Sequence, residues 1–285
     1  MNTIGVIGGS GLYELEGLEE IREDVIHTPF GEPSDAYVSG RLGSNRLVFL
    51  PRHGRGHRHL PDEVNYPANI WGMKFLGVER IISITAVGSL KEELAPTNVV
   101  LPDQYFDRML GSRRSTFFGD GCVAHVSMAE PSCPDLRQAL FEAARGQGAV
   151  VHLGGTYLNM EGPAFSTRAE SEVYRSWGMD VIGMTNVAEA RLAREAEICY
   201  QSVALVTDYD CWHQEHADVT VEMVVDNLRK NVEMARKIIR AVLPKLPDSR
   251  DCACSRGLAN AIMTAPEQIP PETRRRLDII IGKYV

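Results

Sequence analysis

The chain has 285 residues, with 30 lysines and arginines against 38 aspartates and glutamates, which gives a formal net charge of −8 at pH 7. An acidic surface repels the phosphate backbone of DNA or RNA, which argues against a nucleic-acid partner. Apolar residues make up 44% of the sequence, but no apolar run reaches the roughly 18 residues that a membrane span needs. We therefore expect a globular protein with no nucleic-acid or membrane partner.

The N-terminal segment has no basic leader and passes directly into a strand-like run, which predicts a cytoplasmic protein. The six cysteines are then expected to be reduced and mostly buried. Cys252 and Cys254 are one residue apart, so a disulfide between them would need a tight turn and would be strained or regulatory. No second pair stands at zinc-finger spacing, so the sequence predicts no metal site.

Short apolar runs rich in branched residues alternate with longer amphipathic stretches along the chain. The short runs predict strands at 4–7, 47–50, 80–85, 98–101, 149–153, 181–184 and 202–207. The amphipathic stretches predict helices at 66–76, 134–145, 166–177, 188–196 and from about 220 to 242. This alternation predicts an α/β fold, a single domain with a mixed central β-sheet flanked by helices. Residues 1–245 would form its body and residues 246–285 a C-terminal appendage of the same domain.

Three turns that suit an anion follow predicted strands. The glycines of residues 5–11 let backbone amides approach a ligand, and Ser10 adds a hydroxyl. Residues 52–59 hold six basic or imidazole side chains, and residues 84–90 form a third turn of small residues. Each alone could be a plain turn or a solvated surface, but ligands in open α/β sheets gather where strands end. Together the three turns predict a phosphate site.

The second half of the chain offers different chemistry. Ser166 or Thr167 could cap a helix, and Phe165 could stack on a ring, although a place in the core is favoured for it when it is taken alone. Asp208 and Asp210 follow a predicted strand and are two residues apart, so both carboxyls could face one ligand edge. Neighbouring carboxyls raise one another's pKa, which lets one donate a proton while the other accepts. Solvated aspartates in a capped turn are the alternative.

Ten ordered segments closely resemble the methylthioadenosine phosphorylase branch of the trimeric purine-nucleoside phosphorylases. They are GVIGGSGL, HTPFGEPSDA, PRHGRGH, VNYPANIW, ITAVGSL, HVSMAEPSCP, MEGPAFSTRAE, GMTNVAEA, AREAEICY and VTDYDCW. The resemblance implies the purine-nucleoside and uridine phosphorylase-like fold. It also implies a pentosyltransferase of purine and methionine salvage that splits 5′-methylthioadenosine with inorganic phosphate as co-substrate and without a cofactor.

The resemblance also assigns roles to matching positions. The implied phosphate ligands are Ser10, Arg52, His53, Thr85, Ala86 and Thr185. Met184 would lie beneath the ribose, Phe165 and Ser166 would line the base pocket, and Val221 and Val224 would receive the methylthio group. Asp208 and Asp210 match the adenine readers. This fits the chemistry of the pair, since a protonated Asp208 can donate to N7 of the adenine and Asp210 would accept from the amino group or orient its neighbour. His125 would reach a neighbouring subunit's pocket, which implies a homotrimer or a dimer of trimers, and the C-terminal appendage could contact a neighbour.

Two alternatives stay open at this point. Asn186 departs from some adenosine-reading relatives, so a methylthioinosine or general purine-nucleoside phosphorylase is an alternative. A dinucleotide-binding or sensing module would use the N-terminal glycines, but it would leave the basic segment and the paired aspartates unexplained.

Overall fold

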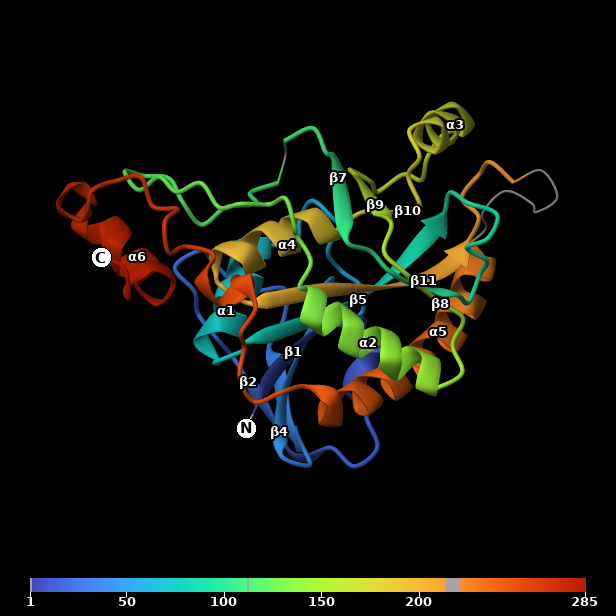
Figure 1. Cartoon of the computed structure of the whole chain (residues 1–285), viewed down its shortest axis with the longest axis horizontal. Coiled ribbons are helices and arrows are strands. Elements are labelled where there is room, and N and C mark those ends of the chain that lie inside the picture. Colours follow the sequence, from blue (N-terminus) through green and yellow to red (C-terminus); the bar gives the residue numbers. More distant parts are fainter. Residues whose placement is uncertain (1, 112, 214–220) are drawn as a thin grey trace.

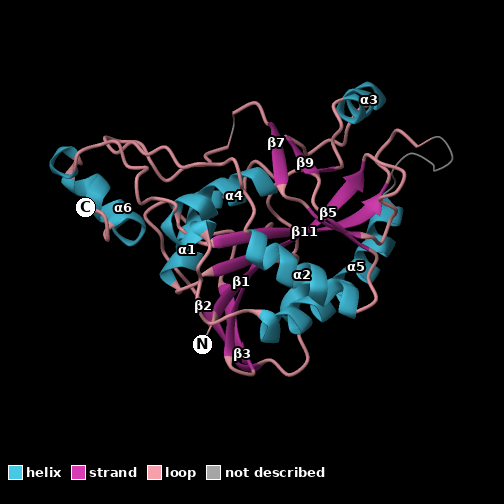
Figure 2. Cartoon of the chain, in the orientation of Figure 1, coloured by secondary structure: helices cyan, strands magenta, loops and turns pink. Residues whose placement is uncertain are grey.

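The structure is a computed structural model that describes residues 2–111, 113–213 and 221–285, with the backbone but not the side chains of Ser10, residues 221–226 and residue 228 (Figure 1). Strands gather in the middle of the molecule and helices surround them (Figure 2). This arrangement confirms the predicted α/β fold with a mixed central sheet flanked by helices. None of the helices within these ranges is both long and apolar enough to cross a membrane.

The described residues form one mixed sheet. Its strands are β1 (Thr3–Gly8), β2 (Glu19–Asp24), β3 (Tyr37–Leu42), β4 (Asn45–Pro51), β5 (Arg80–Ser89), β6 (Val99–Leu101), β7 (Gln104–Arg108), β8 (Val151–Leu153), β9 (Thr156–Met160), β10 (Val181–Gly183) and β11 (Cys199–Asp208). One path runs β2-β3-β4-β1-β5-β10-β9-β7, while β11 pairs with β5 and β6, and β6 pairs with β8. The strands β1, β4, β5 and β11 are mutually parallel, so their carboxyl ends lie at one edge.

The long strand β5 has neighbours on both sides along most of its length. Its first half pairs with β1, from Ile4 opposite Arg80 onward, and β11 runs along its other side. Where β1 ends, β10 takes over in the antiparallel sense, with Ile182 opposite Gly88. The residues of β5 and β11 are nearly all buried, as expected for central strands that are covered on both faces.

Helices cover both faces of the sheet. They are α1 (Tyr66–Phe75), α2 (Pro134–Gly146), α3 (Arg168–Ser176), α4 (Asn186–Glu195), α5 (Val221–Val242) and α6 (Pro271–Ile281). Side chains alternate across β1: Ile4 and Val6 pack in the core beneath α2 and α5, while Ile7 packs in the core beneath α1 and α4. The expected helix at 166–177 begins one residue after Thr167, whose side chain forms a reciprocal capping box with Glu170.

An extension projects from the body of the molecule beyond α1 and α4 and contains α6 (Figure 1). Two segments far apart in the sequence build it: the amide of His125 donates to the carbonyl of Ala261 at 2.8 Å, and that of Met263 donates to Val123 at 2.8 Å. Phe117, Leu277 and their neighbours share one buried cluster with α1 and α4. The C-terminal residues are thus joined to the core through apolar packing as well as hydrogen bonds.

Candidate active site

A cavity of about 500 Å³ lies at the edge where the parallel strands end. Its wall is built from the ends of β1, β5, β10 and β11 and from the turn after β4, which places Gly9, Ala86, Met184 and Asp208 around one space. The turn after β4 is fixed to β1, because the amide of Arg52 donates to the carbonyl of Gly8 at 2.9 Å. This position, outside the carboxyl ends of parallel strands, is where ligands bind in open α/β sheets.

Arg52 is buried at one end of the cavity and is held by protein acceptors. Its Nε and Nη2 donate to the two carboxylate oxygens of Glu189, Nη2 also donates to Ser83 Oγ at 2.6 Å, and Nη1 donates to the carbonyl of Ile84 at 3.1 Å. Burial works against the charge, but the neighbouring Glu189 carboxylate outweighs it and raises the pKa of Arg52. Four of the five guanidinium N–H groups are used among the described residues, which leaves one Nη1 hydrogen for an anion.

His53 follows Arg52 and presents a neutral ring to the cavity. Its Nδ1 lies 2.8 Å from the carbonyl oxygen of His59, so Nδ1 carries the proton and Nε2 keeps its lone pair. Burial, reinforced by the charge of Arg52, lowers the pKa of His53 to about 4. The ring also stacks on His57, with centroids 4.4 Å apart. A neutral His53 can accept a hydrogen bond from a protonated phosphate oxygen at neutral pH.

The same end of the cavity holds the start of a helix. Thr185 is the residue before α4, and Thr85 and Ala86 reach the cavity from β5. The first amides of a helix have no partner within it, but here the amide of Val187 donates to Asn159 Oδ1 at 3.0 Å and does not line the cavity. Thr85, Thr185 and the remaining Nη1 hydrogen of Arg52 therefore lie around one region of the cavity.

Asp208 and Asp210 lie at the other end of the cavity, at the end of β11. The hydroxyl of Thr207 donates to Asp208 Oδ2 at 2.7 Å, and the amide of Asp210 donates to Asp208 Oδ1 at 2.8 Å. Burial nevertheless raises the pKa of Asp208. Burial also raises the pKa of Asp210, and the carboxylate of Asp208 raises it further. One of the two carboxyls can thus keep its proton at a higher pH than a surface aspartate would.

The Oδ2 atom of Asp210 is buried and has no hydrogen-bond partner among the described residues. The residue also has a left-handed backbone, with φ of 53°. A buried polar atom without a partner costs free energy, and strained backbone gathers at binding sites. Both observations indicate that Asp210 is placed for a ligand atom and not for the stability of the free protein.

Gly88 allows Asp208 to approach β5. A Cβ atom at this position would lie 3.0 Å from Asp208 Oδ1 and 3.1 Å from Ile182 Cγ2, so any larger residue would push the carboxyl away. Gly162 likewise leaves room for the side chain of Met184, because a Cβ atom at position 162 would lie 2.5 Å from Met184 Sδ. The φ angle of Gly162 is +72°, which also favours glycine. The thioether is thereby held against the wall between the two polar ends.

An apolar surface joins the two ends. It consists of Leu12, Val87, Met160, Ile182, Met184, Leu205 and Val232, together with Phe165. Phe165 is 55% exposed, which corrects the expectation of a core position for it taken alone; its ring stands at the rim of the cavity. An apolar middle with polar groups at both ends suits a ligand that carries a ring and an uncharged substituent.

Most of the predicted site residues line this cavity. They are Arg52, His53, Thr85, Ala86, Phe165, Met184, Thr185, Asp208 and Asp210. Ser166 does not line the cavity, and its carbonyl accepts a hydrogen bond from Cys211 Sγ at 3.3 Å. The side chains of Ser10, Val221 and Val224 lie outside the described residues. His125 is exposed on the extension and takes no part in the cavity of its own chain.

The structure corrects the significance given to Asn186. This residue is fully buried and does not line the cavity. Its Nδ2 donates to Ser202 Oγ at 2.6 Å and to Tyr200 OH at 3.0 Å, and its Oδ1 accepts from Thr185 Oγ1 at 3.0 Å. Asn186 therefore positions the side chain of Thr185 and does not itself form part of the cavity wall.

Several cavity residues were not singled out from the sequence. His57, His59, Leu60 and Pro61 complete the wall beyond His53, and Glu189 holds Arg52 from the first turn of α4. Residues 57–59 belong to the basic segment that predicted an anion site, so that segment carried the signal. Nothing in the spacing along the chain connects Glu189 with Arg52.

Known proteins resemble this chain over nearly its whole length. The profile of the Phosphorylase superfamily matches residues 3–244. The S-methyl-5′-thioadenosine phosphorylase of Geobacter sulfurreducens is 59% identical over 99% of both chains, and that of Gloeobacter violaceus is 56% identical over 99% of this chain and 95% of its own.

Two solved structures are also similar. A methylthioadenosine phosphorylase from an antarctic soil metagenomic library has a TM-score of 0.94 with 46% identity and covers 98% of both chains. A Schistosoma mansoni adenosine/methylthioadenosine phosphorylase mutant in complex with methylthioadenosine has a TM-score of 0.81 with 38% identity, over 88% of this chain and 93% of its own.

Proposed function

Because the chain belongs to the phosphorylase superfamily, we propose that it uses inorganic phosphate to split 5′-methylthioadenosine into adenine and 5-methylthio-α-D-ribose 1-phosphate. The observation that carries the proposal is the pair of polar ends in one cavity. Anion donors stand at one end and two buried carboxyls with raised pKa at the other. The apolar wall between them suits a ribose with a thioether substituent.

The reaction breaks the bond between C1′ and N9 and forms one between C1′ and a phosphate oxygen. The electrons of the broken bond move to the purine, and the protonated carboxyl of Asp208 gives its proton to N7. Asp210 accepts a hydrogen bond from the 6-amino group through its unpartnered Oδ2. Positive charge that develops on the sugar is stabilised by the phosphate dianion below it.

Phosphate would be held by the remaining Nη1 hydrogen of Arg52, by the neutral ring of His53 and by Thr185, the residue before α4. Thr85, Ala86 and Ser10 supply further donors in this proposal. No metal or organic cofactor has a role in it. Holding both reactants in one orientation is worth about 7–11 kcal/mol of the barrier in well-oriented reactions.

The remaining groups belong to the proposal as well. Met184 and Phe165 would contact the ribose and the base, with Ser166 supporting the base pocket. Val221 and Val224 would contact the methylthio group. Since His125 is exposed and does not line the cavity of its own chain, it would complete a neighbour's cavity in a homotrimer or a dimer of trimers. The enzyme would act in the cytoplasm, in purine and methionine salvage.

The experiment is to incubate the purified chain with methylthioadenosine, with and without phosphate, and to separate the products by chromatography. We expect adenine and a sugar phosphate only when phosphate is present. Adenine released at the same rate without phosphate would identify a hydrolase and reject the proposal. Arsenate in place of phosphate serves as a control, because it supports cleavage but gives free methylthioribose.

A further inference from the structure

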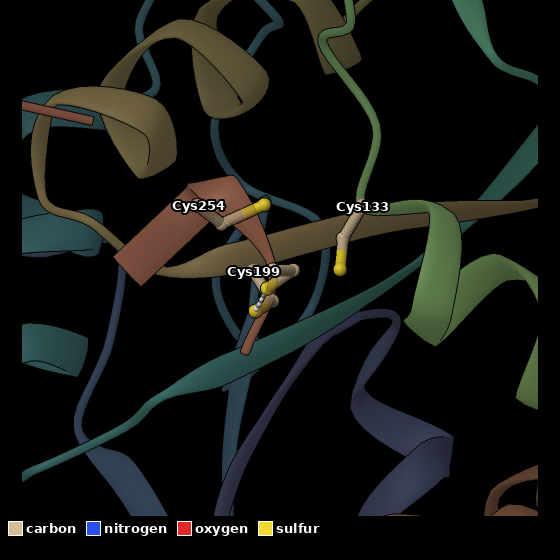
Figure 3. Close-up of side chains that lie close together, drawn as sticks. Cys133, Cys199 and Cys254 are labelled. Carbon is tan, nitrogen blue, oxygen red and sulfur yellow. Dashed lines mark hydrogen bonds between the residues drawn. The ribbon is translucent and has the colours of Figure 1, made fainter. Parts of the chain in front are cut away.

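Four of the six cysteines lie together near the first residue of β11, at the opposite end of this strand from Asp208. The sulfur atoms of Cys133, Cys199, Cys252 and Cys254 are all within 4.8 Å of one another. Figure 3 shows that Cys133, Cys199 and Cys254 come from separate segments of the chain and lie close together. All four are free thiols in the structure, and the first, second and fourth are fully buried.

Local backbone structure fixes each of these thiols. Cys133 is the residue before α2, and its amide donates to the carbonyl of Tyr200 at 2.9 Å. Cys199 begins β11, and its amide donates to the carbonyl of Glu79 at 3.0 Å. Cys252 and Cys254 stand at the start of the short helix Ala253–Arg256. The second pair that zinc-finger spacing failed to reveal is thus supplied by two distant segments.

The distances suit four ligands around one small ion. Thiolate bonds of about 2.3 Å in a tetrahedral zinc site place the sulfur atoms roughly 3.8 Å from one another. In the cluster, Cys199 Sγ and Cys252 Sγ are 3.3 Å apart and no pair exceeds 4.8 Å. The 3.3 Å distance and the 4.8 Å limit lie on either side of the tetrahedral edge, and none of the four cysteines forms a disulfide.

Cationic groups lie beside the cluster. Four thiolates and one divalent cation carry a net charge of −2. Arg80 and Arg250 line a cavity of about 70 Å³ together with Cys133, Cys199 and Cys252, and α2 directs its N-terminus at the cluster. Asp135 and Asp251 line the same cavity, and Arg250 forms an ion pair with Glu79 at 3.4 Å, so the arginines offset the charge of the site only in part. Arg80 is buried and makes hydrogen bonds of 2.7–2.8 Å to neutral oxygens, with Glu79 at 4.0 Å.

We propose that Cys133, Cys199, Cys252 and Cys254 form a structural site for one soft divalent cation of the zinc type. Binding releases to solvent the protons of those thiols that still carry them, and it requires no oxidant. All four positions are filled by thiolates, so no place is left for a substrate and the ion acts as a crosslink. The crosslink ties the segment after α5 to α2 and β11.

The first experiment measures metal in the full chain purified under a non-chelating phosphine reductant. We expect one zinc per chain by elemental analysis. After the zinc is removed, a Co²⁺ titration should give visible d–d bands and a thiolate charge-transfer band that saturate at one equivalent and disappear on adding Zn²⁺. Absence of both the zinc and the cobalt bands would overturn the proposal.

Two variants locate the site. Cys252→Ser should weaken zinc binding at least tenfold, measured by competition with a chromophoric chelator, and should reduce the charge-transfer band. Cys122→Ser removes a buried thiol elsewhere in the core and should leave both unchanged. Equal effects of the two substitutions would contradict the assignment. Alkylation of the denatured wild-type chain provides a further test. If these four cysteines resist alkylation because they form disulfides under the same reductant, the proposed metal site is refuted.

Discussion

The two ends of the cavity hold their charges in opposite ways. At the end that we propose for phosphate (the phosphate end), Arg52 is paired with Glu189 and most of its donors are used within the protein. At the base end, Asp210 leaves a buried oxygen without a partner among the described residues, and burial raises the pKa of both aspartates. The first arrangement fixes the donors of Arg52 in position. The buried carboxyls at the base end keep a proton that can be transferred to a ligand. Their burial makes the ligand-free protein less stable.

The largest effect is expected when the proton donor at the base end is removed. Asp208→Asn keeps the shape of the side chain but cannot protonate N7, so kcat for methylthioadenosine should fall by about 10²–10⁴-fold. Its amide can donate to a 6-oxo group, so methylthioinosine should lose less. Steady-state kinetics with both nucleosides measure the ratio, and the exposed Asp62→Asn is the matched control. An unchanged ratio of the two rates would remove Asp208 from base reading.

At the phosphate end, a substitution can break the ion pair between Arg52 and Glu189. Glu189→Gln leaves the Arg52 charge buried without its counterion, and removing one partner of a buried pair typically costs about 3–5 kcal/mol. The free energy of unfolding, from urea denaturation, should fall by that order. Glu142→Gln affects a partly exposed ion pair with Lys245 and an exposed hydrogen bond from Gln138, and it should change the free energy of unfolding by less than about 1 kcal/mol. Similar losses in the two variants would mean that the Arg52–Glu189 pair contributes no more than a surface pair.

The smallest expected effect is a pH-dependent change in stability when Asp210, at the base end, is replaced. Burial raises the folded-state pKa of Asp210, so its charged form destabilises the free protein above that pKa and the cost vanishes as pH falls to the unfolded value. Asp210→Asn should therefore stabilise the ligand-free chain at pH 8, by a gain on the order of 1 kcal/mol. The gain should disappear as the pH approaches 4.

Thermal unfolding of both forms across pH gives this difference. His53 acts in the other direction, because its pKa is lowered to about 4 and its stabilising contribution is lost as pH falls from its usual range. Its effect is common to both proteins and cancels in the comparison. A gain from Asp210→Asn that stays constant from pH 8 to pH 4 would show that the carboxyl is not the group concerned.

Sequence patterns predicted the central strands and most helices because burial leaves a direct signal in them. Strand β5 and strand β11 are apolar runs, and α5 has a clear amphipathic period. The edge strand β2 has the sequence EEIRED and is exposed, so only its pairing with β3 makes it a strand. Strand β7 was missed for the same reason, since β9 beside it supplies its partner.

The residues of the site also divide into those that the sequence could predict and those that it could not. Residues that follow strands, such as His53 and Asp208, were predictable because strand ends converge in this kind of sheet. Asn186 and Glu189 were not, since both act through side chains brought to them by other segments. The cysteine cluster is a further example, because it joins segments more than fifty residues apart in the chain.

The position of β5 between neighbours on both sides has a consequence for how the protein opens. Strand β5 carries Thr85 and Ala86, and β11 pairs with it along this stretch. Amides in such a strand exchange their hydrogens with solvent only when the whole fold opens, whereas the exposed loop that carries Phe165 can open locally. Hydrogen exchange should therefore be slowest at the phosphate wall and fast at the rim beside the base, so that a nucleoside can enter and leave while the anion-binding wall stays in place.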